Sequence, residues 1–183
     1  MATDAPERFI ALLRGVNVGG ITVKSAALSA AFVEAGFRNV RTVLASGNVG
    51  FELAGAEADL SALKLQIEAV LERAFGYDAW IVLRTREEVR RIADAYPFAR
   101  RDDIEHPYVV FSSSQDVLDE LLTASGEARS SVEAVLLGDG VLYWRVPKGS
   151  SLDTPFAGLL AKQKYKPHVT TRNLRTVEKL VTV

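Results

Sequence analysis

The same order of strand and helix patterns occurs twice along the 183 residues, and this repetition limits the folds that are open to the chain. In the first half the patterns follow the order strand, helix, strand, strand, helix and strand. They occupy residues 8–14, 25–35, 40–45, 49–53, 59–76 and 79–85, respectively. A connecting helix at 86–96 precedes the same order in the second half, which occupies residues 108–113, 115–125, 131–137, 141–146, a short helix from 154, and 167–169, before a final helix from Asn173. We therefore predict an α+β protein of two ferredoxin-like β-α-β-β-α-β halves, residues 1–84 and 85–183, with a C-terminal helix.

Local signals set the expected ends of these elements. Ser25 and Asp59 are candidate N-caps, and Gly76 is a candidate helix end. The stretch Thr85–Glu88 fits a capping box. Tight hairpins are predicted at Ser46-Gly47-Asn48 and at Gly138-Asp139-Gly140.

Composition excludes several classes of protein. With 48% hydrophobic and 25% charged residues the chain can bury a core, and 22 Lys and Arg against 23 Asp and Glu provide no overall field for nucleic acid or anionic membrane. No cysteine is available for a disulfide, a thiolate metal site or a nucleophile. No apolar run approaches the ~18 residues of a membrane span, and no signal peptide is recognisable. We expect a cytosolic protein that is a monomer or a weak homodimer.

Three separated stretches carry a family resemblance. RFIALLRGVNVGG, VRTVLASGNVGFE and PHVTTRNLRTVEKL resemble, in order and spacing, the hallmarks of the bacterial family known as domain of unknown function 1697. The resemblance implies an α+β protein made of two related halves, and it implies no activity. The last motif more usually reads TTRNWNT, whereas Leu174 and Arg175 follow Asn173 here.

A glycine-rich connection between the first strand and the first helix is the main candidate ligand site. Glycines permit close backbone approach, and a loop that enters a helix can direct N–H groups at an anion. The candidate residues are Arg14, Gly15, Asn17, Gly19, Gly20 and Lys24. A P-loop is excluded because Ile21 stands where that motif needs lysine, and the Rossmann fingerprint fails at Asn17. The alternative is a connection in which glycines only turn the chain.

A second candidate lies near the C-terminus. If the segment 162–168 is extended, Lys162, Lys164, Lys166 and His168 alternate onto one side. The following residues, at the start of the last helix, are Thr170, Thr171, Arg172 and Asn173. They form a candidate anion seat, with a solvated lysine run and a plain Asn173 cap as the alternative.

The remaining candidates have simpler structural interpretations. Ser46 and Asn48 are candidate ligand contacts, but a hairpin explains them without a ligand. Phe9 and Phe51 offer an RNA-stacking surface only if they are exposed, and core positions are favoured. An acidic loop around Asp102 is better explained by balance with Arg100 and Arg101 than by a metal. No catalytic residue, metal site or cofactor is predicted.

Two functions remain open. The first is binding of a small molecule that carries a phosphate or carboxylate, such as a nucleotide-like ligand, in a cleft between the halves at the two candidate sites. The second is a non-catalytic interaction or structural domain, with weak nucleic-acid binding as a variant. Whether the first kind would also be an enzyme is left open by the residues.

Near-neutral charge leads to a prediction about nucleic acid. Any binding should be weak and should fall steeply as salt rises, because the affinity would come from the few phosphates that the lysine run neutralises. Fluorescence anisotropy with DNA and RNA oligonucleotides over a salt series measures this slope. Nanomolar binding that salt does not change would contradict the prediction.

Overall fold

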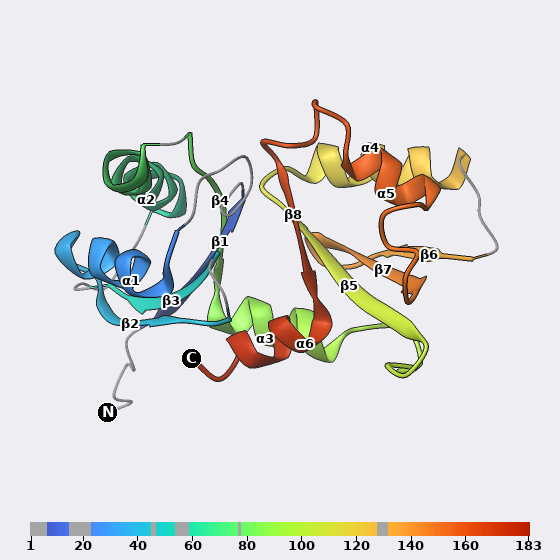
Figure 1. Cartoon of the computed structure of the whole chain (residues 1–183), viewed down its shortest axis with the longest axis horizontal. Coiled ribbons are helices and arrows are strands. Elements are labelled where there is room, and N and C mark those ends of the chain that lie inside the picture. The colour runs from blue at the N-terminus through green and yellow to red at the C-terminus, as the bar shows by residue number, and fades with distance from the viewer. Residues whose placement is uncertain (1–6, 15–22, 45–46, 54–58, 77, 128–131) are drawn as a thin grey trace. The chain divides into compact units, whose positions relative to one another are not determined.

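A computed structural model of the chain describes residues 7–14, 23–44, 47–53, 59–76, 78–127 and 132–183 (Figure 1). By contacts the chain divides into two compact units. The N-terminal unit comprises Met1–Val89 together with Lys179–Val183, and the C-terminal unit comprises Arg90–Glu178. The boundary after residue 84 that the order of patterns indicates stays a prediction.

The N-terminal unit contains one four-stranded antiparallel sheet. Its elements are β1 (Arg8–Arg14), α1 (Ser25–Glu34), β2 (Arg38–Thr42), β3 (Asn48–Glu52), α2 (Leu60–Phe75) and β4 (Trp80–Thr85). The strands lie in the order β2-β3-β1-β4, so β1 pairs with β3 on one side and with β4 on the other. Helix α3 (Arg86–Asp94) follows directly and starts at the predicted capping box, where Thr85 Oγ1 accepts from Glu88 N at 3.1 Å and the Glu88 carboxylate accepts from Thr85 N at 2.7 Å.

A second four-stranded antiparallel sheet forms the C-terminal unit. Its elements are β5 (Glu105–Ser112), α4 (Gln115–Glu127), β6 (Ala134–Leu137), β7 (Val141–Pro147), α5 (Pro155–Leu160) and β8 (Val169–Asn173), followed by α6 (Leu174–Leu180). The strand order β6-β7-β5-β8 repeats the order of the first sheet, with β5 in the place of β1. The predicted α+β chain of two similarly ordered halves is confirmed at this level.

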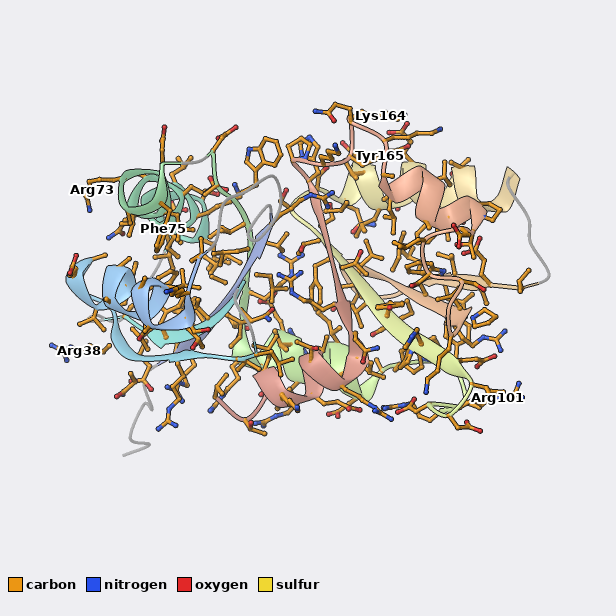
Figure 2. All side chains as sticks on the ribbon, in the orientation of Figure 1. Arg38, Arg73, Phe75, Arg101, Lys164 and Tyr165 are labelled. Carbon is orange, nitrogen blue, oxygen red and sulfur yellow. The ribbon has the colours of Figure 1, made fainter. Side chains whose placement is uncertain are left out.

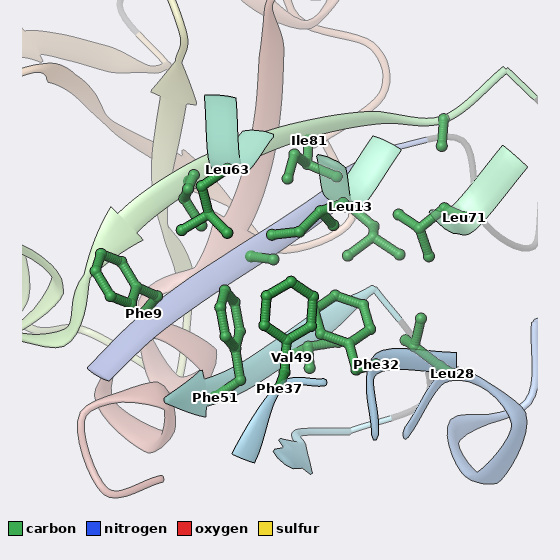
Figure 3. Packing of buried hydrophobic residues seen from close by; sticks show 14 of the residues in the cluster. Phe9, Leu13, Leu28, Phe32, Phe37, Val49, Phe51, Leu63, Leu71 and Ile81 are labelled. Atoms are coloured by element: carbon green, nitrogen blue, oxygen red, sulfur yellow. The ribbon is translucent and has the colours of Figure 1, made fainter. Parts of the chain in front are cut away.

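Buried aromatic rings hold α1 and α2 on one face of the N-terminal sheet (Figure 3). Phe9 and Phe51 lie on neighbouring strands with ring centroids 5.8 Å apart, and Phe32 and Phe37 pack on Phe51 at 5.4 and 4.7 Å. Both strand rings are at most 1% exposed, so they belong to the core and present no surface on which a base could stack.

Glu133, directly before β6, connects two other elements of the C-terminal unit. Its carboxylate accepts from Trp144 Nε1 at 2.8 Å and from Phe156 N at 3.0 Å, so one side chain satisfies an indole in β7 and a backbone amide in the first turn of α5. Trp144 and Phe156 are both buried in the cluster that α4 and α5 form over this sheet. Removal of the carboxylate would leave two donors without this acceptor.

Several expected element ends shift, each for a physical reason. Strand β2 covers 38–42 instead of 40–45, because Asn39 has φ +49° at a register shift and Leu44 has φ +60°, which ends the extended chain. Helix α1 begins at Ser25 itself, with Lys24 and not Ser25 at the N-cap position. The lysine segment 161–168 forms turns and is not extended, and the predicted strand 167–169 begins only at Val169 and continues to Asn173, where β5 supplies its hydrogen-bond partners.

Strand β5 starts at Glu105 and therefore includes Pro107, which the sequence placed in a loop. Proline lacks an N–H and is normally kept out of central strands. Here β8 first pairs with β5 at Tyr108, so among the described strands Pro107 has a register partner in β7 alone and no second ladder needs its amide.

The last residues of the chain pack in the N-terminal unit against Gly50. A Cβ added to Gly50 would lie 3.1 Å from Val183 Cγ2 and 3.4 Å from Ile10 Cδ1. Ile10 and Gly50 are register partners on the sheet face opposite α1 and α2. The absent side chain thus makes room for the C-terminal valine.

Replacing Glu133 should destabilise the C-terminal unit. Glu133→Ala leaves the buried Trp144 indole and the Phe156 amide without their acceptor, and we expect a loss of about 2–4 kcal/mol of unfolding free energy. Urea denaturation followed by tryptophan fluorescence measures it. The matched control is Glu120→Ala, an exposed carboxylate that pairs with Lys164 at the surface, which should change stability by less than about 1 kcal/mol. Equal losses in both variants would contradict this role.

Candidate functional site

Three of the predicted motifs meet at one end of the N-terminal sheet. The backbone N–H of Leu13, next to the end of β1, donates to Gly47 O at 2.8 Å in the hairpin between β2 and β3. At the start of α1, Ser25 Oγ donates to Leu44 O at 3.5 Å in the same hairpin. The end of β1, the hairpin and the start of α1 are therefore neighbours, which brings Arg14, Lys24 and Asn48 to the same end of this sheet.

Arg14 is a partly buried cation at the end of β1. Its register partner is Trp80 at the start of β4, and it shares the sheet face of Ile10 and Leu12, opposite α1 and α2. Burial lowers the pKa of the Arg14 guanidinium from its ordinary value. An arginine still keeps its charge at neutral pH, so this end of the sheet holds a permanent and partly desolvated positive group.

The first turn of α1 contains no acidic residue. No side chain caps its first turn, no acidic residue lies in that turn, and the exposed Lys24 occupies the N-cap position. A helix N-terminus carries a partial positive charge that a carboxylate or hydroxyl normally offsets. A cation at this position adds to that positive charge and does not offset it.

Asn48 has a structural contact in the hairpin. It is 4% exposed, and its Nδ2 donates to Val43 O at 3.1 Å across the base of the turn. Gly47 has φ +90° and supports the same turn. A ligand contact by Asn48 stays a prediction, and Gly15, Asn17, Gly19, Gly20 and Ser46 lie outside the described residues.

The predicted C-terminal residues lie in the C-terminal unit. Arg172 Nη1 donates to Thr170 Oγ1 at 2.7 Å and to Thr171 O at 3.0 Å. Asn173 Oδ1 accepts from Arg175 N at 3.0 Å and so caps α6, as the plain-cap interpretation expects. Their participation in a ligand site with Arg14 stays a prediction.

Arg84 occupies the same position in the N-terminal sheet as Arg172 does in the C-terminal sheet. This correspondence was not identified from the sequence. Arg84 pairs with Ile10 on the central strand β1, and Arg172 pairs with Val109 on the central strand β5. Each guanidinium donates to the carbonyl of the preceding residue, at 2.9 Å to Leu83 O and at 3.0 Å to Thr171 O. Each arginine is also followed by a residue whose side chain caps a helix: Thr85 caps α3, and Asn173 caps α6. This shared pattern of an arginine before a capping residue is the sequence signal that could have revealed the correspondence.

Lys164 of the lysine run and Asp102 of the acidic loop take part in ion pairs. Lys164 pairs with Glu120 and lies over the Tyr165 ring, with Nζ 4.7 Å from the ring centroid. Lys164 and Tyr165 are labelled in Figure 2. Asp102 accepts from Arg100 at 2.5–2.9 Å and from Arg175 Nε at 3.0 Å, while Arg100 also pairs with Glu178. Within the described part of the chain, no cluster of His, Asp or Glu has the composition of a metal site.

Comparison with known proteins supports the motif-based resemblance. Residues 7–143 match the model of a family described as a protein of unknown function, DUF1697. The chain belongs to this family. No curated protein matches the sequence.

Solved structures extend the fold comparison over nearly the whole chain. The conserved bacterial protein SP0830 from Streptococcus pneumoniae is similar with a TM-score of 0.79 and 22% identity, covering 97% of this chain and 98% of its own. This likeness shows a shared fold for the family member described here. An unknown protein from Galdieria sulphuraria aligns over 97% of this chain and 89% of its own, at 12% identity, but its TM-score of 0.27 is too low to indicate a common fold.

Among the described residues of this family member, no helix combines the length and apolar character needed to cross a membrane. The longest helix, α2, has an amphipathic pattern, with Leu63, Ile67 and Leu71 buried against the sheet and charged side chains on its other side.

Asp102 should make the stability of the C-terminal unit depend on pH in the acidic range. Hydrogen bonds from Arg100, and then from Arg175, lower the pKa of this carboxyl from 3.8 to about 2. Because the folded pKa lies below the unfolded one, the stabilisation is complete above about pH 4 and is lost as pH falls towards 2. Unfolding measured from pH 6 to 2 should show less pH dependence in Asp102→Asn. An identical dependence in the variant and the wild type would contradict the prediction.

Proposed function

We propose that this family member binds a small molecule bearing a phosphate or carboxylate at the end of the N-terminal sheet where β1, the β2–β3 hairpin and α1 meet. The observation that carries the proposal is the start of α1, which has a lysine at its N-cap and, among the described residues, neither a capping side chain nor an acid in its first turn. Arg14 provides a guanidinium at the same end of the sheet. Because the Arg14 side chain lies on the sheet face opposite α1, the proposed anion lies beyond the end of β1, where it would offset the positive charge of the α1 start and of Lys24 and be reached by Arg14 around the sheet end.

The equivalent junction in the C-terminal unit supports this assignment by contrast. Between β5 and α4 only residues 113–114 intervene, and Ser112 Oγ donates to Ser114 O at 2.9 Å and accepts from Ser114 N at 3.1 Å. Between β1 and α1 the connection spans residues 15–24. A two-residue junction thus suffices to join strand and helix in this arrangement. We infer that the longer connection contacts the ligand, because its glycine-rich sequence allows close backbone approach.

We propose that each half has the ferredoxin-like arrangement and that this arrangement positions the binding residues. Its support is the strand order β2-β3-β1-β4, all antiparallel, with both helices over one face. In such a unit the first strand ends beside the start of the first helix. The position of Arg14 and Lys24 follows from this topology.

Ligand screening by thermal shift tests the function. Inorganic phosphate, nucleotides and carboxylate metabolites are titrated against the wild-type chain, since a ligand at 100 times its Kd stabilises by about 2.7 kcal/mol. We expect at least one anionic class to stabilise the protein and its neutral analogues to leave it unchanged. No stabilisation by any anion would contradict ligand binding and favour the interaction or structural domain.

Variants then locate the site. Arg14→Ala removes a charge-assisted contact, so the Kd for the active anion should rise about 10- to 100-fold, and Lys24→Ala should weaken binding in the same direction. Arg38→Ala is the matched control, because Arg38 is an exposed arginine at the end of β2 remote from Leu44 (Figure 2). An unchanged Kd in Arg14→Ala, with the fold intact, would reject the site.

The same titration tests the sequence-based prediction that Arg172 contacts this ligand. A rise in Kd in Arg172→Ala that is not additive with that of Arg14→Ala supports one shared ligand. An unchanged Kd in Arg172→Ala restricts the site to the N-terminal unit.

A further inference from the structure

Strand β6 presents an apolar outer edge. It is the terminal strand of the C-terminal sheet and pairs with β7 on one side, while in the described part of the chain no strand pairs with its other side. Its four residues are Ala-Val-Leu-Leu, and Leu136 and Leu137 are each 46% exposed. An open edge with exposed leucines is a template for pairing with another strand.

The other three edge strands carry features that oppose such pairing. Arg84 lies on β4 and Arg172 on β8, while β2 carries Arg38 and Arg41 with a register shift between them. Charges and irregularities on an edge strand hinder the addition of a further strand. Strand β6 has neither a charge nor a proline, so it differs from all the other edges of the two sheets.

We propose that β6 pairs antiparallel with β6 of a second copy of this chain, around a two-fold axis perpendicular to the sheet. An isologous contact needs a self-complementary surface, and a short uncharged strand of four apolar residues meets that condition. The net charge of −1 adds little repulsion between copies. Pairing would cover both exposed leucines and complete the hydrogen bonds of the edge.

Charge distinguishes the two registers that centre the pair within the strand, with Val135 or Leu136 on the axis. When a two-fold axis perpendicular to the sheet relates two antiparallel strands, the residue at the axis lies opposite the same residue of the second copy. Residues equally far from it on its two sides then lie opposite each other. With Leu136 on the axis, Glu133 would lie opposite Asp139 of the second copy, which is unfavourable. With Val135 on the axis, Glu133 lies opposite Leu137 and Ala134 opposite Leu136, so no like charges meet within the strand.

The interface is short, so the association should be weak and should depend on concentration. Sedimentation equilibrium of the wild-type chain over a concentration series should show a mass that rises towards that of a dimer. Leu136→Lys should abolish the rise, because a charge would then enter the pair beside the axis. Leu152→Lys is the matched control, since Leu152 is an 87% exposed leucine outside the strands, and it should behave as the wild type.

A cysteine variant tests the register independently of stability effects. The chain has no cysteine, so Val135→Cys carries a single thiol that meets its own copy at the axis. Mild oxidation should cross-link this variant into a dimer and leave the control Leu152→Cys monomeric. A wild type that stays monomeric throughout, a dimer that survives Leu136→Lys, or equal cross-linking of both cysteine variants would overturn the proposal.

Discussion

Pairing of each central strand with neighbours on both sides is the constraint on which the rest of the structure depends. Strand β1 has β3 on one side and β4 on the other, and β5 has β7 and β8. The register sends Phe9, Ala11 and Leu13 to the face that α1 and α2 cover, and Ile10, Leu12 and Arg14 to the opposite face. A slip by one residue would exchange these sets and bury the guanidinium under the helices, so the buried phenylalanines also determine where Arg14 lies.

The two units share one arrangement of strands but differ in a loop and on the sheet face away from the helices. At position 50 the N-terminal unit has a glycine against which Val183 packs, whereas the C-terminal unit has Tyr143 opposite the corresponding Val109, with its hydroxyl donating to Ile92 O at 2.8 Å. The junction between the first strand and first helix also differs, being long and glycine-rich in one unit and closed by Ser112 and Ser114 in the other. The two units share the elements that make the sheet and its core. They differ in loops and on the sheet face opposite the core helices, where substitutions leave the core unchanged.

Several charged side chains form ion pairs that stabilise the fold, whereas Lys24 adds charge at a helix start. Arg8 with Glu52, Arg145 with Glu105, and Arg100 with Asp102 are paired within one unit, and they stabilise strand ends and the loop before β5. Lys24 at the start of α1 instead adds positive charge to a helix end that is already positive. This contrast is why we propose the anion site at the start of α1, where the local positive charges repel each other.

The sequence by itself determined the elements whose signals are local. Asp59 caps α2 with bonds to Ser61 N and Ala62 N, Gly76 ends the helix with φ +67°, and Thr154 and Pro155 begin α5, because capping and backbone freedom depend on neighbouring residues alone. The repeated order of elements and the family followed from the same kind of pattern. Only the tertiary structure decided that Pro107 belongs to β5 and that residues 169–173 form a strand, because the pairing partners of these residues lie far away in the sequence. Packing also decided that Val183 fills the space above Gly50 and that Arg84 matches Arg172, since register across strands is set by the burial of whole faces and not by any local signal.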